Sequence, residues 1–314
     1  MKSLSIFFTG NKNAEIREVD LPAPKYDEVQ VQTFMNGICM ADIWKYNNQF
    51  LDIPAVQGHE GIGAVIKVGK GVKGIKEGDL ITTGRWSQYL NIKEGLFIKL
   101  EKRPDEIDSY VVEPASCAVN AASYMNIYPG DSAILFGAGY MGLLLLQLLN
   151  RYPLSRLIAV DIKDYNLKLA KEFGAMETIN SATDKGKIRL EELIDNPFEI
   201  VYECSGAEEP LVWCTKLAKK AGKIGIYAWH HQKRIQDIQI WHEKGLQVMN
   251  LSPSITAENR PFRSWTAADK LMSAGIIDQK RLVTHKYDFL DINKAMNEST
   301  RRPEGFIKSV LVFT

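Results

Sequence analysis

The first third of the chain alternates short apolar runs with Gly, Pro, Asn and Asp. The runs that predict strands are SLSIFFTG, EVQVQTFM, GAVIKVGKGV, GDLITTG and QYLNIKEGLFIKL. Short strands separated by turn residues at this spacing are typical of small antiparallel barrels. We therefore expect residues 1–115 to form a compact, mostly β domain.

The pattern changes at EPASCAVNAASYM, which predicts a helix, and then alternates apolar strands with amphipathic helices. The expected strands are residues 132–136, 156–161, 176–180, 198–204, 222–227 and 246–250. The expected helices between them include residues 140–152, 164–174 and 209–222, the last two ending on a glycine. This alternation predicts an α/β fold with a doubly wound parallel sheet over residues 116–254.

The last segment, residues 255–314, returns to mixed structure. It holds two helix-like stretches, SWTAADKLMSAG and INKAMNESTRR, and ends in an apolar strand, KSVLVF. A segment of this size buries little surface by itself, so we expect it to pack onto residues 1–115 and complete that domain.

Composition restricts the classes of partner. The 314 residues are 45% hydrophobic and 25% charged with a formal net charge of +1, which gives no reason to expect a nucleic-acid or membrane partner. No apolar run is long enough to span a bilayer, and the N-terminus lacks a signal-peptide pattern, so we expect a cytoplasmic protein. The four cysteines are scattered without a C-x-x-C, which argues against a disulfide framework or a four-thiolate zinc site.

A glycine motif follows the strand SAILF. Gly137-x-Gly139-x-x-Gly142, with Tyr140 and Met141 inside it, stands between that strand and a helix. In this context the glycines permit a tight turn, a close approach of a pyrophosphate to the backbone, and close packing of helix and strand. The motif therefore predicts a dinucleotide site; the alternative is a purely structural turn.

The next expected strand ends in Asp161, where a carboxylate can accept hydrogen bonds from an adenosine ribose. The same negative charge repels the additional phosphate of NADP. We therefore expect NAD to be preferred, with NADP less favoured.

A second motif combines the single Cys39 and the nearby Asp42 with a downstream GHEGIGAVIKVGKGV. A lone buried cysteine is most often an inert small side chain. Here, however, a combination of features resembles the zinc-dependent branch of the medium-chain dehydrogenase/reductase superfamily. These features are Cys39, His59 with the glycine spacing after it, the later VVEP and the dinucleotide half. The resemblance runs nearly end to end and implies a GroES-like catalytic domain and a Rossmann domain.

The resemblance implies one catalytic zinc held by Cys39, His59 and a third ligand, either Glu113 or Glu60. A thiolate, an imidazole and a carboxylate are a ligand set that leaves zinc an open position for substrate. Asp42 is expected to hold the far nitrogen of His59. In the cofactor domain, Ser205 and Tyr227 are expected to join the glycine motif in binding the dinucleotide.

The sequence departs from the family pattern in two places. The lobe with four closely spaced cysteines that binds a structural zinc in relatives is absent. Ala41 stands where the family has a Ser or Thr that carries the substrate proton, and Trp44 stands where some members have a histidine. The candidates left for the proton route are a water chain, Glu60, Lys45 or Tyr46, and the paired His230 and His231 are a further alternative.

The resemblance implies a zinc-dependent oxidoreductase that transfers hydride between a nicotinamide and a secondary alcohol or ketone, including polyols and sugar-derived alcohols. Relatives are usually homodimers or homotetramers, and we expect the same here. Two alternatives stay open. One is a zinc-independent reductase of enones or quinones on the same fold, and the other is a non-catalytic dinucleotide-binding protein.

Overall fold

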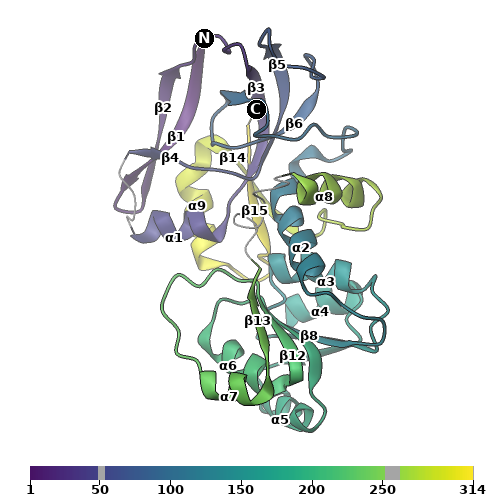
Figure 1. The fold of residues 1–314 in the computed structure, drawn as a ribbon. Coiled ribbons are helices and arrows are strands. Elements are labelled where there is room, and N and C mark those ends of the chain that lie inside the picture. The colour runs from purple at the N-terminus through teal and green to yellow at the C-terminus, as the bar shows by residue number, and fades with distance from the viewer. Residues whose placement is uncertain (49–53, 252–261, 314) are drawn as a thin grey trace. The chain divides into compact units, whose positions relative to one another are not determined.

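The computed structural model describes residues 1–48, 54–251 and 262–313 (Figure 1). The chain forms two compact units, one of Met1–Pro114 with Trp265–Thr314 and the other of Ala115–Ser264. The expected domain boundary at residue 255 lies outside the described residues. Within the described part of the chain, no helix has the length and apolar character to cross a membrane.

The unit of residues 115–264 is built on a parallel sheet of six strands in the order β10-β9-β8-β11-β12-β13. The strands are β8 (Ser132–Phe136), β9 (Arg156–Asp161), β10 (Glu177–Asn180), β11 (Phe198–Glu203), β12 (Ala218–Ile226) and β13 (Gln247–Asn250). The strand that comes first in the chain, β8, lies in the middle, so the chain winds outward in both directions. This confirms the α/β, doubly wound prediction and places a topological switch point between β8 and β11.

Both faces of this sheet are covered, so its central strands are continuous apolar runs that can be recognised in the sequence. All five residues of β8 are buried, and β9 and β11 are almost as completely buried. The helices of the unit are α3 (Tyr140–Leu149), α4 (Asp164–Glu172), α5 (Asp184–Glu192), α6 (Glu208–Leu217) and α7 (Ile238–Lys244), with most of α2 (Val112–Tyr124).

The helix expected over residues 209–222 is shorter than predicted. The helix expected to run from residue 209 to Gly222 ends at Leu217, and Ala218 already has extended backbone angles. Ala218 is buried and pairs with Phe198 of β11, so sheet pairing overrides the helical preference of the following lysines and alanine. Gly222 therefore lies inside β12 and does not end a helix.

The other unit is organised around β3 (Glu28–Gly37), which pairs antiparallel with β5 (Gly61–Val68), β7 (Tyr89–Lys93) and β15 (Lys308–Val312). The pairing of β15 with β3 places the C-terminal segment in the same sheet as the first part of the chain. The remaining strands are β1 (Lys2–Gly10), β2 (Asn13–Asp20), β4 (Ala55–Val56), β6 (Leu80–Thr83) and β14 (Val283–Asp288). Its other helices are α1 (Met40–Asn48), α8 (Arg263–Ser273) and α9 (Ile292–Arg301).

A hydrophobic core of this unit joins distant parts of the chain. Phe8, Tyr46 and Trp86 contact one another edge to face through Phe8, and they pack with residues of α9 and β15. Trp86 has no exposed surface, so it is a core residue and not part of an open pocket.

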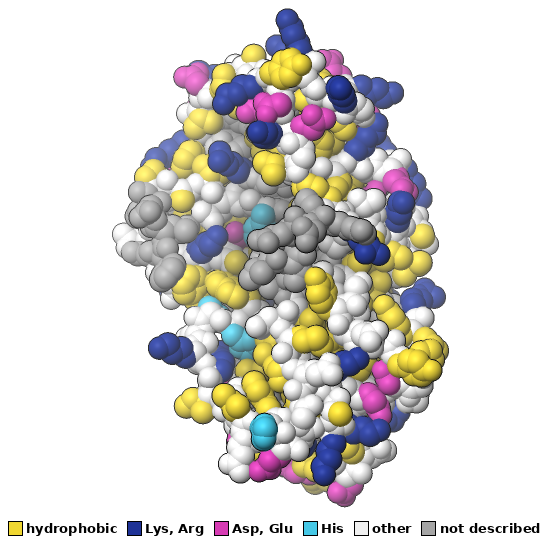
Figure 2. Space-filling model, viewed as in Figure 1, with side chains coloured by type: hydrophobic (Ala, Val, Ile, Leu, Met, Phe, Trp, Pro, Cys, Tyr) yellow, Lys and Arg dark blue, Asp and Glu magenta, His cyan; other side chains and the backbone are white. Residues whose placement is uncertain are grey.

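The surface carries no concentrated charge on the face drawn in Figure 2. Basic and acidic side chains are interspersed there, with apolar side chains between them. This distribution agrees with the net charge of +1.

Candidate functional site

Three of the predicted metal ligands lie together. One ligand atom each from Cys39, His59 and Glu60 lies within 4.8 Å of the others. The fold explains the meeting, because β3 and β5 are antiparallel neighbours and Asn36 pairs with Gly61. Cys39, two residues after β3, and His59 and Glu60, the two residues before β5, therefore reach the same end of the sheet.

Asp42 lies in the first turn of α1 and is completely buried. One carboxylate oxygen, Oδ2, accepts the backbone N–H of Cys39 at 3.0 Å. The other, Oδ1, lies 3.9 Å from Nδ1 of His59 and has no hydrogen-bond partner among the described residues. Burial raises the pKa of Asp42, and the nearby His59 opposes that shift. Asp42 thus lies near the imidazole, at a distance longer than a hydrogen bond, and its role in holding His59 stays a prediction.

Glu60 is buried and pairs with a lysine that the sequence analysis missed. Its Oε2 lies 2.5 Å from Nζ of Lys308, which also donates to the carbonyl oxygen of Ile38 at 2.9 Å. Oε1 of Glu60 lies 4.0 Å from Nε2 of His59. The signal in the sequence is a lysine that opens the otherwise apolar run KSVLVF.

A glycine makes room for this carboxylate. A Cβ atom at Gly37 would lie 1.9 Å from Oε2 of Glu60, so any side chain at that position displaces the acid. Gly37 also donates its N–H to the carbonyl oxygen of Glu60 at 3.1 Å. The end of β3 therefore fixes both the backbone and the side chain of Glu60.

The charges of the cluster favour a bound cation. Burial raises the pKa of the Cys39 thiol, and the carboxylates of Glu60 and Asp42 raise it further, while Lys308 opposes the shift. A metal ion compensates such a concentration of buried acidic groups and stabilises the thiolate. The thiol of Cys39, the imidazole of His59 and the carboxylate of Glu60 lie close together, and this set of ligands fits a zinc ion. Oδ1 of Asp42, which has no hydrogen-bond partner among the described residues, lies near the imidazole and fits the same role.

The structure does not bring Glu113 into this group. Glu113 is the second residue of α2, and the cluster of mutually close ligand atoms found among the described residues contains Glu60 in its place. Of the two carboxylates that the sequence left open, Glu60 is therefore the one that lies beside Cys39 and His59.

The candidates for a proton route differ in their surroundings. The hydroxyl of Tyr46 donates to Oδ1 of Asn293 at 3.0 Å in the core around Phe8. Lys45 is half-buried, and its Nζ donates to Oε1 of Gln57 at 3.2 Å. Ala41 lies in the first turn of α1 and offers no side-chain donor or acceptor.

The three motif glycines of the other unit have different steric roles. Gly137 has a φ of +101°, and a Cβ there would lie 2.8 Å from the backbone nitrogen of Ser205. A Cβ at Gly142 would lie 1.9 Å from the carbonyl oxygen of Gly137. A Cβ at Gly139 would meet no protein atom within 4 Å, so space is open above this glycine. That space is where a bound pyrophosphate approaches the backbone.

The cofactor residues surround this turn. Tyr140 and Met141 begin α3, and the residue before them, Gly139, makes no side-chain cap. N–H groups at the start of a helix are a common binding site for phosphate. Asp161 accepts the N–H of Ala138 at 2.7 Å through Oδ2 and that of Lys163 at 2.9 Å through Oδ1.

Ser205 and Tyr227 follow neighbouring strands of this sheet, and both are hydrogen-bonded to Glu203. The sequence analysis did not single out Glu203. The backbone N–H and the hydroxyl of Ser205 donate to a carboxylate oxygen of Glu203, and the N–H of Tyr227 donates to the Glu203 carbonyl oxygen. The signal in the sequence is an acid that ends the apolar strand FEIVYE.

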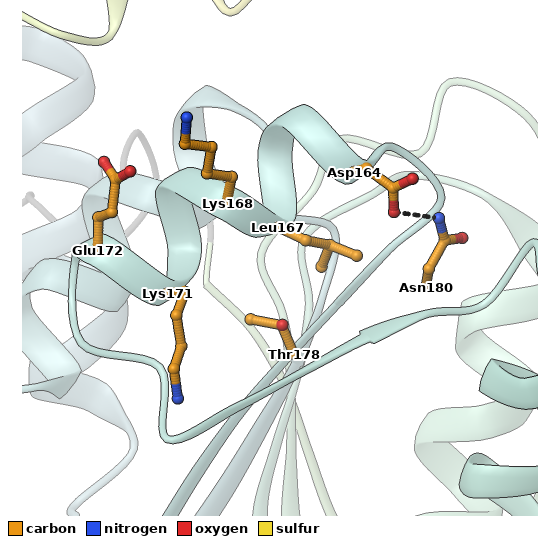
Figure 3. A pocket seen from close by; sticks show the side chains of 7 residues that line it. All are labelled: Asp164, Leu167, Lys168, Lys171, Glu172, Thr178 and Asn180. Atoms are coloured by element: carbon orange, nitrogen blue, oxygen red, sulfur yellow. Dashed lines mark hydrogen bonds between the residues drawn. The ribbon is translucent and has the colours of Figure 1, made fainter.

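A surface pocket of about 500 Å³ lies between α4 and β10 (Figure 3). Asp164 and Asn180 are hydrogen-bonded at 2.7 Å at one end of it, and Lys168, Lys171 and Glu172 project from the helix. None of the predicted cofactor residues lines this pocket.

Comparison with known proteins agrees with this arrangement. A family described as "Alcohol dehydrogenase GroES-like domain" matches residues 25–101, and one described as "Zinc-binding dehydrogenase" matches residues 141–267. The "Uncharacterized zinc-type alcohol dehydrogenase-like protein YdjJ" of Escherichia coli is 25% identical, with 95% of each chain covered. The D-xylulose reductase of Saccharomyces cerevisiae is 27% identical over 91% of this chain and 90% of its own.

Among solved structures, galactitol-1-phosphate dehydrogenase from Escherichia coli superposes with a TM-score of 0.86 over 99% of this chain and 100% of its own. At 21% identity this similarity shows the fold alone. The chain belongs to the medium-chain, zinc-type dehydrogenase superfamily, and it is a dehydrogenase.

Proposed function

We propose that this protein is a zinc- and nicotinamide-dependent dehydrogenase that interconverts a secondary alcohol of polyol or sugar type and its ketone. The observation that carries the proposal is the convergence of Cys39, His59 and Glu60 within 4.8 Å. Relatives named D-xylulose reductase and sorbitol dehydrogenase support the substrate class.

Each residue of the cluster has a distinct task. Cys39, His59 and Glu60 would hold the metal, while Asp42 would orient the imidazole through Nδ1. When bound, zinc supplies a Lewis acid for the substrate oxygen and the nicotinamide supplies the hydride acceptor or donor. Lys308 would hold the Glu60 carboxylate in place through Oε2, which leaves Oε1 facing Nε2 of His59.

The proton route proposed here uses Lys45. The Ala41 side chain has no hydroxyl, and the Tyr46 hydroxyl is committed to Asn293 in the core. Lys45 is partly exposed, its positive charge opposes the rise in the Asp42 pKa that burial causes, and its Nζ donates to Oε1 of Gln57. An ammonium group in that place can pass a proton between the site and solvent.

We propose NAD as the preferred cofactor. Asp161 is the last residue of β9, and its carboxylate accepts a hydrogen bond from the glycine-rich turn. A carboxylate in this place can accept a hydrogen bond from a ribose hydroxyl of NAD and repels the additional phosphate of NADP. One solved relative is described with NADH and another with NADP, so the relatives do not decide the cofactor. The proposed preference for NAD therefore depends on Asp161 of this chain.

The test is a substrate screen of zinc-loaded protein with NAD and NADP against polyols, sugar alcohols, simple alcohols and enones, following absorbance of the reduced nicotinamide. We expect turnover of a polyol with NAD and about one zinc per chain. Cys39→Ala should lose zinc and turnover together. Cys214→Ala, which removes a buried thiol from α6, should keep both.

Two results would contradict the proposal. Reduction of enones or quinones by protein that binds no zinc would favour the zinc-independent reductase. Tight cofactor binding without turnover of any alcohol or ketone would favour a non-catalytic dinucleotide-binding protein.

A further inference from the structure

We propose that Glu203 and His230 are positioning residues that join two cofactor-binding loops and set the affinity for the nicotinamide dinucleotide. This inference rests on the proposed cofactor role of the parallel-sheet unit. Glu203 is the last residue of β11 and has no exposed surface. Its Oε2 lies 2.7 Å from Nε2 of His230, whose side chain is only 13% exposed.

Glu203 organises the loop that follows its own strand. Its second carboxylate oxygen, Oε1, accepts the N–H groups of Ser205 at 2.7 Å and Gly206 at 2.9 Å, and also the Ser205 hydroxyl. A buried carboxylate with this many donors is held in one orientation. The conformation of residues 204–206 therefore depends on Glu203.

The same residue organises the loop that follows β12. The Glu203 carbonyl oxygen accepts the N–H groups of Tyr227 at 2.8 Å and Ala228 at 3.0 Å, and its carboxylate holds His230 two residues further on. Main chain and side chain of one residue thus fix two neighbouring loops.

These loops lie at the place where a dinucleotide binds this type of sheet. Glu203 pairs with Phe136 of β8 on one side and with Ile226 of β12 on the other, at the carboxyl ends of the strands. The turn at Gly137 begins one residue after Phe136 and lies against Ser205. The strand order reverses between β8 and β11, and ligands bind outside the strand ends at such a point.

The partners of His230 define its tautomer. Arg234 can only donate hydrogen bonds, and its Nε lies 3.4 Å from Nδ1 of His230. Nδ1 is therefore the acceptor, and Nε2 carries the proton that it donates to Glu203. Arg234 also donates from Nη2 to the carbonyl oxygen of Gly206 at 2.9 Å, which closes the network on the first loop. With both ring nitrogens engaged inside this unit, His230 acts by position and not as a proton relay.

The test measures NADH binding by fluorescence on zinc-loaded enzyme. His230→Ala leaves a buried carboxylate oxygen without its donor, so we expect the Kd for NADH to rise about tenfold. His230→Gln keeps an N–H donor for Glu203 and should restore the Kd to within about threefold. His242→Ala removes an exposed histidine of α7 and should leave the Kd unchanged.

A second variant and a second readout separate positioning from folding. Glu203→Gln has nearly the same shape and should raise the KM for NAD, while the KM for the alcohol and the zinc content stay as in the wild type. Equal Kd values for wild type and His230→Ala, or equal losses in His230→Ala and His230→Gln, would overturn the inference. Failure of the wild type to bind NADH would instead overturn the proposed function.

Discussion

The ammonium nitrogen of Lys308 lies 2.5 Å from Oε2 of Glu60, and the two side chains are only 6% and 2% exposed. Removing one member of a buried ion pair leaves an uncompensated charge in a poorly solvated place. We therefore expect Lys308→Met to lower the free energy of unfolding of the zinc-free protein by about 3 kcal/mol. Lys308→Arg should lose less, because it keeps the charge. Urea denaturation measures both.

The double variant Glu60→Gln with Lys308→Met provides the control for this pair. Since it leaves no unpaired charge, its stability should recover most of what Lys308→Met loses. Additive losses in the double variant would show that the two residues stabilise the protein independently.

Asp42 lies behind the imidazole of His59 and is expected to control metal affinity. Asp42→Asn keeps an acceptor for the Cys39 N–H but removes the negative charge that faces Nδ1 of His59. Loss of such a carboxylate typically weakens metal binding about 10- to 100-fold. Competition with a chromophoric chelator gives the zinc affinity. Asp20→Asn, in an exposed acid of β2, is the control, and the same zinc affinity in Asp42→Asn as in this control would contradict the role.

Asp161 is expected to set the choice between NAD and NADP. Asp161→Asn removes the charge that repels the additional phosphate, so the ratio of Kd for NADP to Kd for NAD should fall about tenfold. Asp164→Asn, a matched change at the start of α4, should leave the ratio close to that of the wild type. If both variants shift the ratio equally, the effect is a general electrostatic one and not a contact of Asp161.

The second and third motif glycines should respond differently to alanine. At Gly142 a Cβ would lie 1.9 Å from a backbone oxygen, so Gly142→Ala should destabilise the protein by about 2 kcal/mol or more. At Gly139 the space is open in the protein, so Gly139→Ala should keep the melting temperature and lose cofactor affinity. Thermal unfolding and NADH titration distinguish the two, and a stable Gly142→Ala would contradict the steric reading.

Glu199 should make stability depend on acid pH. Burial acts to raise its pKa, but the Lys219 ammonium and the Ser132 hydroxyl and N–H outweigh burial and lower the pKa from 4.5 to about 2. Because the folded pKa is depressed, the stabilisation is present above pH 4.5 and is lost as the pH falls toward 2.

Glu199→Gln should therefore lower the free energy of unfolding by about 1 kcal/mol at neutral pH, a value reduced for solvent screening of the partly exposed Lys219. The difference from the wild type should shrink below the ordinary carboxyl pKa of 4.5. Urea midpoints across the acid range measure it, with Glu77→Gln as the exposed control. A difference that stays constant with pH would exclude the carboxylate as its source.

The sequence by itself determined the parallel-sheet unit closely. The strands Ser132–Phe136 and Arg156–Asp161 have the limits that the sequence predicts. The physical reason is local, since each is a short apolar run buried on both faces and bounded by turn or helix-starting residues. The glycine motif and Asp161 are equally local signals, because their function requires a fixed spacing in one strand–turn–helix unit.

Only the tertiary structure decided which distant residues meet. Strand pairing brings Lys308 to Glu60, joins Glu203 to His230, and places Glu60 and not Glu113 beside Cys39 and His59. It also ends α6 at Leu217, because Ala218 pairs with Phe198. These contacts depend on register and on side-chain burial between segments far apart in the chain, and no local pattern of hydrophobic and polar residues specifies them.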